Sequence, residues 1–474
     1  MEQTSSSGPS ISYWDCINHW LRTSTMLKIA VIGVLVLMLL IPTSMLQSLI
    51  QEREQTRNQA VAEVSSKWGS EQVLGGPVPS VPYLITGKDD KGNPQTPVTA
   101  YAHFLPDDLQ FDGEVRPEQR NRGIFVVMLY NTRLTIRGSF KKPSVAALGI
   151  PPGAVQWDKA FLSLGISDMT GIRDAIRFKI NDRTVAAEPG IPSDDILSSG
   201  VSIPIALDTD TYRFESAINL NGSTQLSFLP FGKQTSVRLR SPWTTPSFTG
   251  SFLPDQRKVS AGGFLASWKV LQFNRNFPQQ GLGNFLSRSS DPARIDPTRA
   301  EPMRTDVAQI NPSAFGVKLL LPVDQYQKTM RSAKYGILFV ILTFVAFFFI
   351  EILDRRRIHP IQYLLVGFAI CLFYLLLLSI SEHISFDWAY LIGGGVILTL
   401  ITFYVRYVFQ NLRLTMLFSA VLTLLYGFFY SLLQLEDYSL LLGSFGLLLI
   451  LGVVMYLTRH VNWYRAYEPE QTIG

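Results

Sequence analysis

The sequence predicts an α-helical integral membrane protein with six transmembrane helices and a large β-rich domain between the first and second helices. Only 17% of its 474 residues are charged, against roughly 25% in typical soluble domains, and the mean hydropathy is +0.17. The apolar residues are concentrated in long uncharged runs that flank one long polar segment. A lipid bilayer is therefore the predicted partner of the apolar part.

Six apolar runs are long enough to cross a bilayer as helices, because a hydrocarbon core of about 30 Å needs roughly 20 residues at 1.5 Å each. The second run carries one carboxylate, Glu351, close to its end. The predicted spans are Ile29–Ile50, Tyr335–Leu353, Ile361–Ser381, Trp388–Val405, Leu414–Leu435 and Tyr438–Thr458.

Lys and Arg residues in the short loops predict the orientation, because positive residues beside a span are retained in the cytoplasm. Loops 382–387 and 436–437 contain no Lys or Arg, so these loops and the segment 51–334 are expected outside, with both termini in the cytoplasm. The basic residues that flank the other span ends are Arg22, Lys28, Arg355, Arg356, Arg357, Arg406, Arg413, Arg459 and Arg465.

These assignments divide the chain into five predicted parts. A cleaved signal peptide is the alternative for the first span, since Ala60-Val61-Ala62 offers small residues. The apolar run is longer than the roughly 7 to 15 residues of a signal peptide, and the triplet lies well beyond its end, which favours an anchor. The parts are a cytoplasmic tail (1–28), a signal-anchor helix (29–50), the β-rich domain outside (51–334), a five-helix transmembrane region (335–458) and a cytoplasmic tail (459–474).

The segment after the anchor changes from helical to extended character. Gln51–Lys67 is polar and favours a continuing helix, whereas Pro and Gly residues punctuate the chain from Gly75 onward. Gln279–Asn311 is rich in Pro, Arg, Asp and Ser and predicts a long loop. Short apolar or alternating runs between turn residues favour a sandwich or barrel-like domain. The predicted strands are 123–130, 133–140, 161–166, 177–180, 212–220, 225–229, 236–239, 264–273 and 316–321.

Charge and cysteine content exclude some classes of partner and cross-link. The segment 51–334 contains 33 of the 42 Lys and Arg and 27 of the 37 Asp and Glu, an excess of six positive charges. We interpret this as too small and too dispersed for nucleic-acid binding. Cys16 and Cys371 both lie outside this segment, so it can form no internal disulfide.

The sequence offers no motif of an enzyme, and we predict that the protein is not one. The segment 51–334 contains a single histidine, His103, no cysteine and no Gly-x-Ser-x-Gly. For His103 we favour a solvent-facing or satisfied histidine over a catalytic one, because no partner lies nearby in the sequence. The five histidines are scattered, which predicts no zinc site, and no phosphate-binding or dinucleotide motif occurs. No cofactor or metal site is therefore predicted.

Polar residues beside the predicted spans are the candidates for function, because ionisable groups there are costly to bury. The cluster Glu382, His383, Asp387, Glu436 and Asp437 could converge above the helices, near Lys328, Arg331 and Lys334. Ordinary interfacial salt bridging is the favoured interpretation over a cation or proton site. Arg355, Arg356 and Arg357 are interpreted as topology determinants that contact anionic headgroups.

Several long runs resemble the CreD family of bacterial inner-membrane proteins. In the membrane part these are Asp354–Ala369, Ser381–His383, Leu435–Tyr438 and the entry segment Val323–Tyr335. In the domain outside they are Gly165–Asp168, Phe228–Pro230, Ser241–Trp243, Phe252–Pro254 and Asn274–Pro278. The matches extend from about Met26 to Tyr464, nearly the whole chain.

The resemblance implies a cell inner membrane protein that supports cell envelope integrity, with expression tied to a two-component system and to envelope stress such as β-lactams. It implies a periplasmic location for the β-rich domain, and it implies no catalytic residues. The resulting hypothesis is a non-enzymatic protein whose periplasmic domain interacts with an envelope protein or glycan. The alternatives are a transporter or channel that uses the polar cluster, and a membrane-tethered envelope hydrolase. The sequence predicts no oligomeric state.

Overall fold

The computed structural model describes residues 25–86, 96–286, 311–320, 325–354, 358–435 and 438–459. The chain forms two compact units, of which one comprises Met1–Thr56 with Val323–Gly474 and the other Arg57–Pro322. The division falls inside one continuous helix, α2 (Thr25–Trp68). The predicted helical continuation of the first span is confirmed, since α2 does not end where its apolar part ends.

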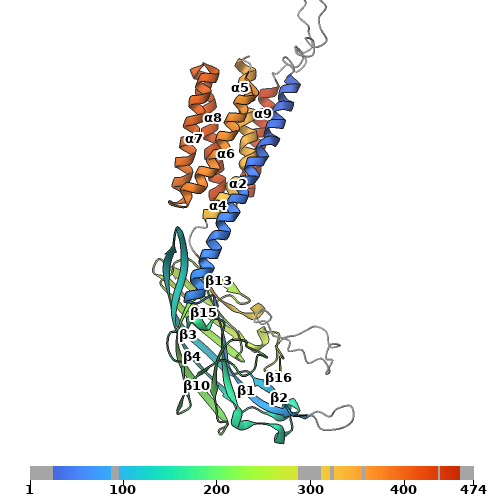
Figure 1. The fold of residues 1–474 in the computed structure, drawn as a ribbon, viewed down its shortest axis with the longest axis vertical. Coiled ribbons are helices and arrows are strands. Elements are labelled where there is room, and N and C mark those ends of the chain that lie inside the picture. Colours follow the sequence, from blue (N-terminus) through green and yellow to red (C-terminus); the bar gives the residue numbers. More distant parts are fainter. Residues whose placement is uncertain are drawn as a thin grey trace, which may run out of the picture. The chain divides into compact units, whose positions relative to one another are not determined.

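The first unit is a bundle of apolar helices (Figure 1). Five helices are long and apolar enough to cross a membrane, or six if the pair α4 and α5, bent by 42°, counts as one span. The general prediction of several apolar helices is confirmed. Besides α2, the helices are α4 (Gln325–Lys334), α5 (Gly336–Asp354), α6 (Pro360–Ser381), α7 (Phe386–Phe409), α8 (Leu412–Gln434) and α9 (Ser439–Thr458).

Local sequence determines where the bundle helices begin. His359 caps α6 by accepting a hydrogen bond from the backbone N–H of Ile361, and Pro360 occupies the first helical position, where its missing N–H has no cost. Between α7 and α8, Gln410 adopts the left-handed conformation and Asn411 caps the next helix through Arg413 N–H at 3.0 Å. Such short connections place consecutive helices side by side.

Aromatic side chains fill the interior of the bundle. The Phe339 and Tyr426 rings lie 4.6 Å apart, and Phe373 contacts Tyr426 and Tyr390 at 5.0 and 5.3 Å. The hydroxyl of Tyr390 donates to the backbone carbonyl of Tyr426 at 2.9 Å, which satisfies a polar atom buried in this core. Edge-to-face contacts of this kind add specific geometry to apolar packing.

The second unit contains two β-sheets packed around one apolar core (Figure 1). Phe111 of one sheet and Phe228 of the other meet with ring centroids 4.8 Å apart. The predicted β-rich domain is confirmed. All strand pairs within the sheets are antiparallel except β1 with β11 and β3 with β12, which are parallel.

The nine-stranded sheet has the order β13-β17-β11-β1-β5-β9-β8, with β2 paired to β1 and β16 to β2. Its strands are β1 (Gln72–Ile85), β2 (Val98–Phe104), β5 (Phe161–Ile166), β8 (Glu188–Pro189), β9 (Gly200–Pro204), β11 (Gln225–Phe228), β13 (Pro246–Gly250), β16 (Gln280–Leu282) and β17 (Phe315–Leu319).

The eight-stranded sheet has the order β14-β15-β12-β3-β4-β10-β6-β7. Its strands are β3 (Asp108–Arg122), β4 (Phe125–Lys141), β6 (Arg177–Ile180), β7 (Arg183–Ala186), β10 (Thr211–Ser223), β12 (Gln234–Ser241), β14 (Gln256–Ser260) and β15 (Gly263–Leu271).

The structure differs from the strand predictions in two ways: two predicted runs form one strand, and nine strands were not predicted, namely β1, β2, β3, β7, β8, β9, β13, β14 and β16. The runs 123–130 and 133–140 form the single strand β4, because the polar residues between them are paired: Asn131 donates to Asn221 Oδ1 and Thr132 donates to the Glu114 carbonyl, each at 3.0 Å. Strand β3 was not predicted, because its outward residues are polar and it contains Pro117. Most of the predicted loop 279–311 lies outside the described residues, although Gln280–Leu282 forms β16.

Candidate functional site

Three members of the predicted polar cluster lie within the described residues. Glu382 caps the end of α6, where its carboxylate accepts a hydrogen bond from the Tyr326 hydroxyl at 3.1 Å and lies 4.0 Å from Arg53 Nε. His383 follows it and is exposed. Glu436 and Asp437 lie outside the described residues.

Asp387 belongs to a different hydrogen-bonded group from Glu382. Its carboxylate accepts from the Tyr430 hydroxyl at 3.2 Å and from the side-chain amide of Gln434. The amide oxygen of Gln434 in turn accepts from Lys328 Nζ at 3.3 Å. The described carboxylates therefore have neutral or basic partners, as ordinary interfacial pairing would give, and no group of three metal-ligating residues occurs in the described part of the chain. Arg355, Arg356 and Arg357 lie outside it.

Glu351 forms the most buried ionic contact of the bundle's described part. The side chain is 5% exposed and its carboxylate accepts three hydrogen bonds: from Lys28 Nζ at 2.6 Å, from the Tyr363 hydroxyl at 2.8 Å and from the Ile358 N–H at 3.1 Å. A cavity of about 200 Å³ lies beside this group. A buried carboxylate is stable only when its lone pairs are satisfied. Lys28 of α2 and Tyr363 of α6 satisfy those of Glu351 in α5, so the contact joins the three helices.

His103 is buried in the β-rich domain between two partners distant in sequence. Its Nδ1 lies 2.8 Å from Ser80 Oγ, and its Nε2 lies 3.0 Å from Asp195 Oδ2, which also accepts from Ser193 at 2.7 Å. A hydrolytic triad has the serine on Nε2 and the carboxylate on Nδ1. Here the order is reversed and Ser80 is 1% exposed, which agrees with the structural interpretation of this histidine.

The environment of Asp195 explains why its carboxylate is stable at this partly buried position. Partial burial of the carboxyl opposes its ionisation, but hydrogen bonds from His103 and Ser193 outweigh that effect and hold its pKa below the usual value. The sequence gives no sign of these contacts, because Ser80 and Asp195 are 23 and 92 residues away from His103.

Two of the runs in the β-rich domain that resemble the CreD family contain residues with structural roles. Asp168 of the Gly165–Asp168 run accepts from the Ser70 N–H at 2.7 Å, and Ser167 Oγ accepts from Val73 N–H at 2.9 Å. These bonds fix the start of β1. Arg275 of the Asn274–Pro278 run is 9% exposed and donates to the carbonyls of Phe277 and Phe231 at 2.9 and 3.3 Å.

A polar surface on the eight-stranded sheet is the largest candidate for binding. Successive residues of a strand point to opposite faces. On β3, Leu109 and Phe111 face the core while Gln110 and Asp112 face outward. The same alternation on the neighbouring strands produces one exposed face of charged and polar side chains.

Cross-strand pairing arranges part of this face in a row. The row crosses six neighbouring strands in the order β6, β10, β4, β3, β12 and β15. On each strand, one residue is paired with the member of the row on the next strand. Its members are Lys179, Glu215, Arg137, Gln110, Ser236 and Lys269.

The face has a strong positive excess, and we call it the charged face. Five of its strand residues are acidic: Asp108, Asp112, Glu114, Glu118 and Glu215. Thirteen are basic and exposed: Arg116, Arg120, Arg122, Arg133, Arg137, Lys141, Arg177, Lys179, Arg213, Arg238, Arg240, Lys258 and Lys269.

Asp112, Glu114, Glu118 and Glu215 pair with Arg side chains of the face, and Asp108 accepts a hydrogen bond from the Gln110 amide at 2.7 Å. Arg137 lies 2.8 Å from Glu215, while Arg116 and Arg240 lie 2.8 and 3.2 Å from Glu114. The hydrogen bond from Arg116 is the main cause that lowers the pKa of Glu114. The remaining basic side chains supply the net positive charge of the surface.

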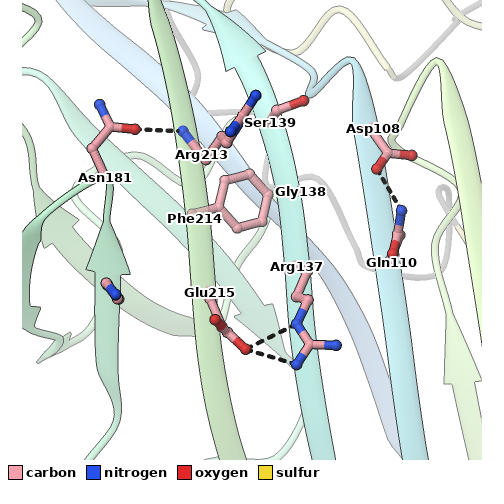
Figure 2. A pocket seen from close by; sticks show the side chains of 10 residues that line it. Asp108, Gln110, Arg137, Gly138, Ser139, Asn181, Arg213, Phe214 and Glu215 are labelled. Atoms are coloured by element: carbon pink, nitrogen blue, oxygen red, sulfur yellow. Dashed lines mark hydrogen bonds and ion pairs between the residues drawn. The ribbon is translucent and has the colours of Figure 1, made fainter.

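Two adjoining clefts are hollowed into the charged face. One, of about 370 Å³, is bordered by Asp108, Arg137, Arg213 and Glu215 on neighbouring strands and by Asn181 in the turn after β6, all of which Figure 2 shows. The second, of about 680 Å³, extends across β12 and β15. Both clefts are lined by Gln110 and Arg137, so they form one continuous polar surface. Sequence reasoning missed it, because its basic residues come from seven strands and are dispersed along the chain.

The chain matches known proteins over most of its length. The sequence model of the family "Inner membrane protein CreD" matches residues 24–464. The inner membrane protein CreD of Escherichia coli (strain K12) is 32% identical over 442 residues, which cover 92% of this chain and 93% of that protein. The resemblance inferred from the sequence is confirmed.

Two solved structures that resemble this chain are remote likenesses. An M1 zinc metallopeptidase from Deinococcus radiodurans is 13% identical, with 38% of this chain and 41% of that chain covered and a TM-score of 0.19. A two-domain M1 zinc metallopeptidase bound to L-tryptophan is also 13% identical, over 38% and 43% of the two chains, with a TM-score of 0.17. Scores this low support no conclusion about fold or activity.

Proposed function

This chain belongs to the CreD family of inner membrane proteins, and from that premise we propose that its β-rich domain is a non-enzymatic interaction module that supports cell envelope integrity. In this proposal the apolar helices anchor the domain, which lies in the periplasm and contributes to resistance against envelope stress such as β-lactams. The single observation that carries the proposal is the charged face with its two adjoining clefts.

Loop charges support the periplasmic location. The short loops 382–387 and 436–437 have no Lys or Arg, whereas the short segments at the opposite span ends do, and by the positive-inside tendency this supports a cytoplasmic location for both termini. A cysteine introduced at the exposed Lys159 would test this in cells that carry a Cys16→Ser and Cys371→Ser background. Labelling by a membrane-impermeant maleimide that reaches the periplasm is expected, and protection until the inner membrane is permeabilised would contradict it.

The contacts on the charged face favour binding over catalysis or transport. Most of its acidic groups are paired with Arg side chains, an arrangement that suits ion pairing and not a pair of carboxylates that act as acid and base. The carboxylates of Glu382 and Asp387 in the bundle accept hydrogen bonds from Tyr and Gln side chains. Neither arrangement resembles the intramembrane carboxylate relay of a pump.

The experiment that tests the proposal is complementation of cells that lack the gene. A double charge reversal on the charged face, Lys179→Glu with Lys269→Glu, is expected to lose protection against a β-lactam while the protein stays at normal levels in the membrane. The matched control is Lys159→Glu with Lys318→Glu, which changes the net charge equally outside the charged face. Full protection by the charged-face variant would overturn the proposal.

A further inference from the structure

We propose that the charged face binds a linear glycan that carries carboxylate groups. This inference rests on the proposed function and names the chemical class of its ligand. It starts from the row of six cross-strand neighbours that begins at Lys179 and ends at Lys269.

Charge selects an anionic ligand. Among the described residues, no acidic side chain forms an ion pair with Lys179, Arg213 or Lys269. The paired Arg137 between them presents a guanidinium whose fork also fits carboxylate oxygens. In the row, Lys179 and Arg137 lie two strand intervals apart and Arg137 and Lys269 lie three apart, which is about 10 and 14 Å at the strand spacing of a sheet. The surface therefore presents cations in series, which suits a ligand with several negative charges in series.

The dimensions of the row select a linear ligand. Strands lie about 4.8 Å apart, so the five intervals from Lys179 to Lys269 extend over about 24 Å. The surface is continuous along this direction, because both clefts are lined by Gln110 and Arg137. A pocket for a compact small molecule is usually enclosed and mostly apolar, whereas these clefts are lined mainly by charged and amide side chains.

Neutral hydrogen-bonding groups between the charges select a glycan. Gln110 and Ser236 lie between Arg137 and Lys269 in the row, and Ser139 and Asn181 lie beside the row in the first cleft. Asn181 is held by its bond to the Arg213 N–H at 2.9 Å, visible in Figure 2. Amide and hydroxyl side chains both donate and accept, which suits the hydroxyl groups of sugars.

The same surface does not suit a lipid bilayer or a protein as the main partner. Interfacial membrane binding requires a broad apolar face that enters the headgroup layer, and protein interfaces have an apolar, aromatic-rich centre. In the described part of the face, the exposed large apolar side chains are Leu265 and Leu271 on β15, near the sheet edge. The centre of the row is polar.

The test uses the full-length protein in nanodiscs of phosphatidylcholine, so that no anionic lipid competes. The probe is fluorescently labelled polygalacturonate, a linear polyuronate, compared with neutral dextran of matched length. We expect saturable binding of the polyuronate and none of the dextran. Raising the salt from about 0.05 to 0.5 M should weaken the interaction, because the Debye length shortens severalfold.

Two charge-matched variants locate the binding. Lys179→Glu with Lys269→Glu should weaken polyuronate binding roughly tenfold or more, equivalent to about 1.4 kcal/mol. Lys159→Glu with Lys318→Glu should bind as the unaltered protein does. Equal elution from a sizing column and equal thermal unfolding of the two variants show that neither result comes from misfolding.

Several results would overturn the inference. These are absence of polyuronate binding, equal binding of dextran, and equal weakening by both double variants. Equal or tighter binding of poly-glutamate would identify an acidic polypeptide as the ligand instead. Binding only to vesicles that contain phosphatidylglycerol would identify a lipid surface.

Failure of the inference is distinguishable from failure of the proposed function. If the charged-face variant loses envelope protection although no glycan binds, the interaction module stands and the ligand class is wrong. If glycan binds through the face but the variant protects cells fully, the ligand class stands and the proposed cellular role is wrong.

Discussion

Lys28 Nζ lies 2.6 Å from Glu351 Oε1, so the first apolar helix is joined to the end of α5 by an ion pair whose carboxylate is almost entirely buried. The Tyr363 hydroxyl at 2.8 Å holds the second carboxylate oxygen. Removal of one member should therefore cost more than the pair itself contributes, since the other charge is left without its partner.

Lys28→Met is expected to destabilise the bundle by about 2 kcal/mol, less than the roughly 3 to 5 kcal/mol of a fully buried pair because Lys28 is partly exposed. In the Lys28→Met and Glu351→Gln double variant, much of that loss should be recovered. Unfolding in mixed micelles of dodecyl sulfate measures both quantities. Strict additivity of the two single changes would show that the contact has no energetic role.

Arg275→Lys should destabilise the β-rich domain by about 3 kcal/mol, because a lysine leaves several buried carbonyls without donors. The guanidinium donates to Phe277 and Phe231, and burial lowers the pKa of Arg275 to about 10, so it stays charged at neutral pH. Hydrogen exchange of the full chain reports the loss, and the exposed Arg257→Lys is the control. Equal exchange in both variants would contradict this role.

Acid sensitivity of the domain should depend on Asp195. Its folded-state pKa is depressed, since hydrogen bonds from His103 and Ser193 outweigh the opposing effect of burial. The ionised form thus stabilises the fold above the unfolded-state pKa of about 3.9, and this contribution is lost as the pH falls through the folded-state value.

Asp195→Asn should therefore unfold at a lower urea concentration than the unaltered protein at pH 7, and the difference should shrink below about pH 4. The neighbouring exposed Asp194→Asn is the control and should behave as the unaltered protein does. A difference between Asp195→Asn and the unaltered protein that stays constant with pH would rule out this linkage.

The sequence predicted those parts of the fold that depend on local pattern. Long apolar runs identified the helices, and β5 and β6 were predicted with their observed bounds, because their residues alternate or are wholly apolar between turn residues. The structure differs where non-local pairing decides: polar β3 is a strand because β4 and β12 pair with it on both sides.

The charged face escaped prediction for a similar reason. A net excess of six positive charges over 284 residues does not indicate a charged binding surface. The surface forms because the pairing of β6 with β10 and of β12 with β15 brings Lys179 and Lys269 into one row. Likewise, only the fold brings Ser80 and Asp195 into contact with His103. The membrane-end carboxylates were found because their signal, charge beside an apolar run, is local.

Gly69 sets the turn between the end of α2 and β1, and its substitution should be poorly tolerated. Its φ of +136° is a conformation that L-residues rarely adopt, and a Cβ there would lie 2.7 Å from the carbonyl oxygen of Asn221. The next residue, Ser70, donates its N–H to Asp168 at 2.7 Å, so the backbone cannot shift without breaking that bond. Both effects act on the same short connection.

Gly69→Ala should therefore destabilise the β-rich domain by about 2 kcal/mol or more, the scale of backbone strain at one residue added to a steric contact. Gly153→Ala is the matched control, because its Cβ would meet no atom within 4 Å and its backbone is not in a glycine-specific region. Hydrogen exchange at 70–75 in the full chain should rise in the first variant and not in the second. Unchanged protection in Gly69→Ala would mean that the connection can relax without releasing Asp168.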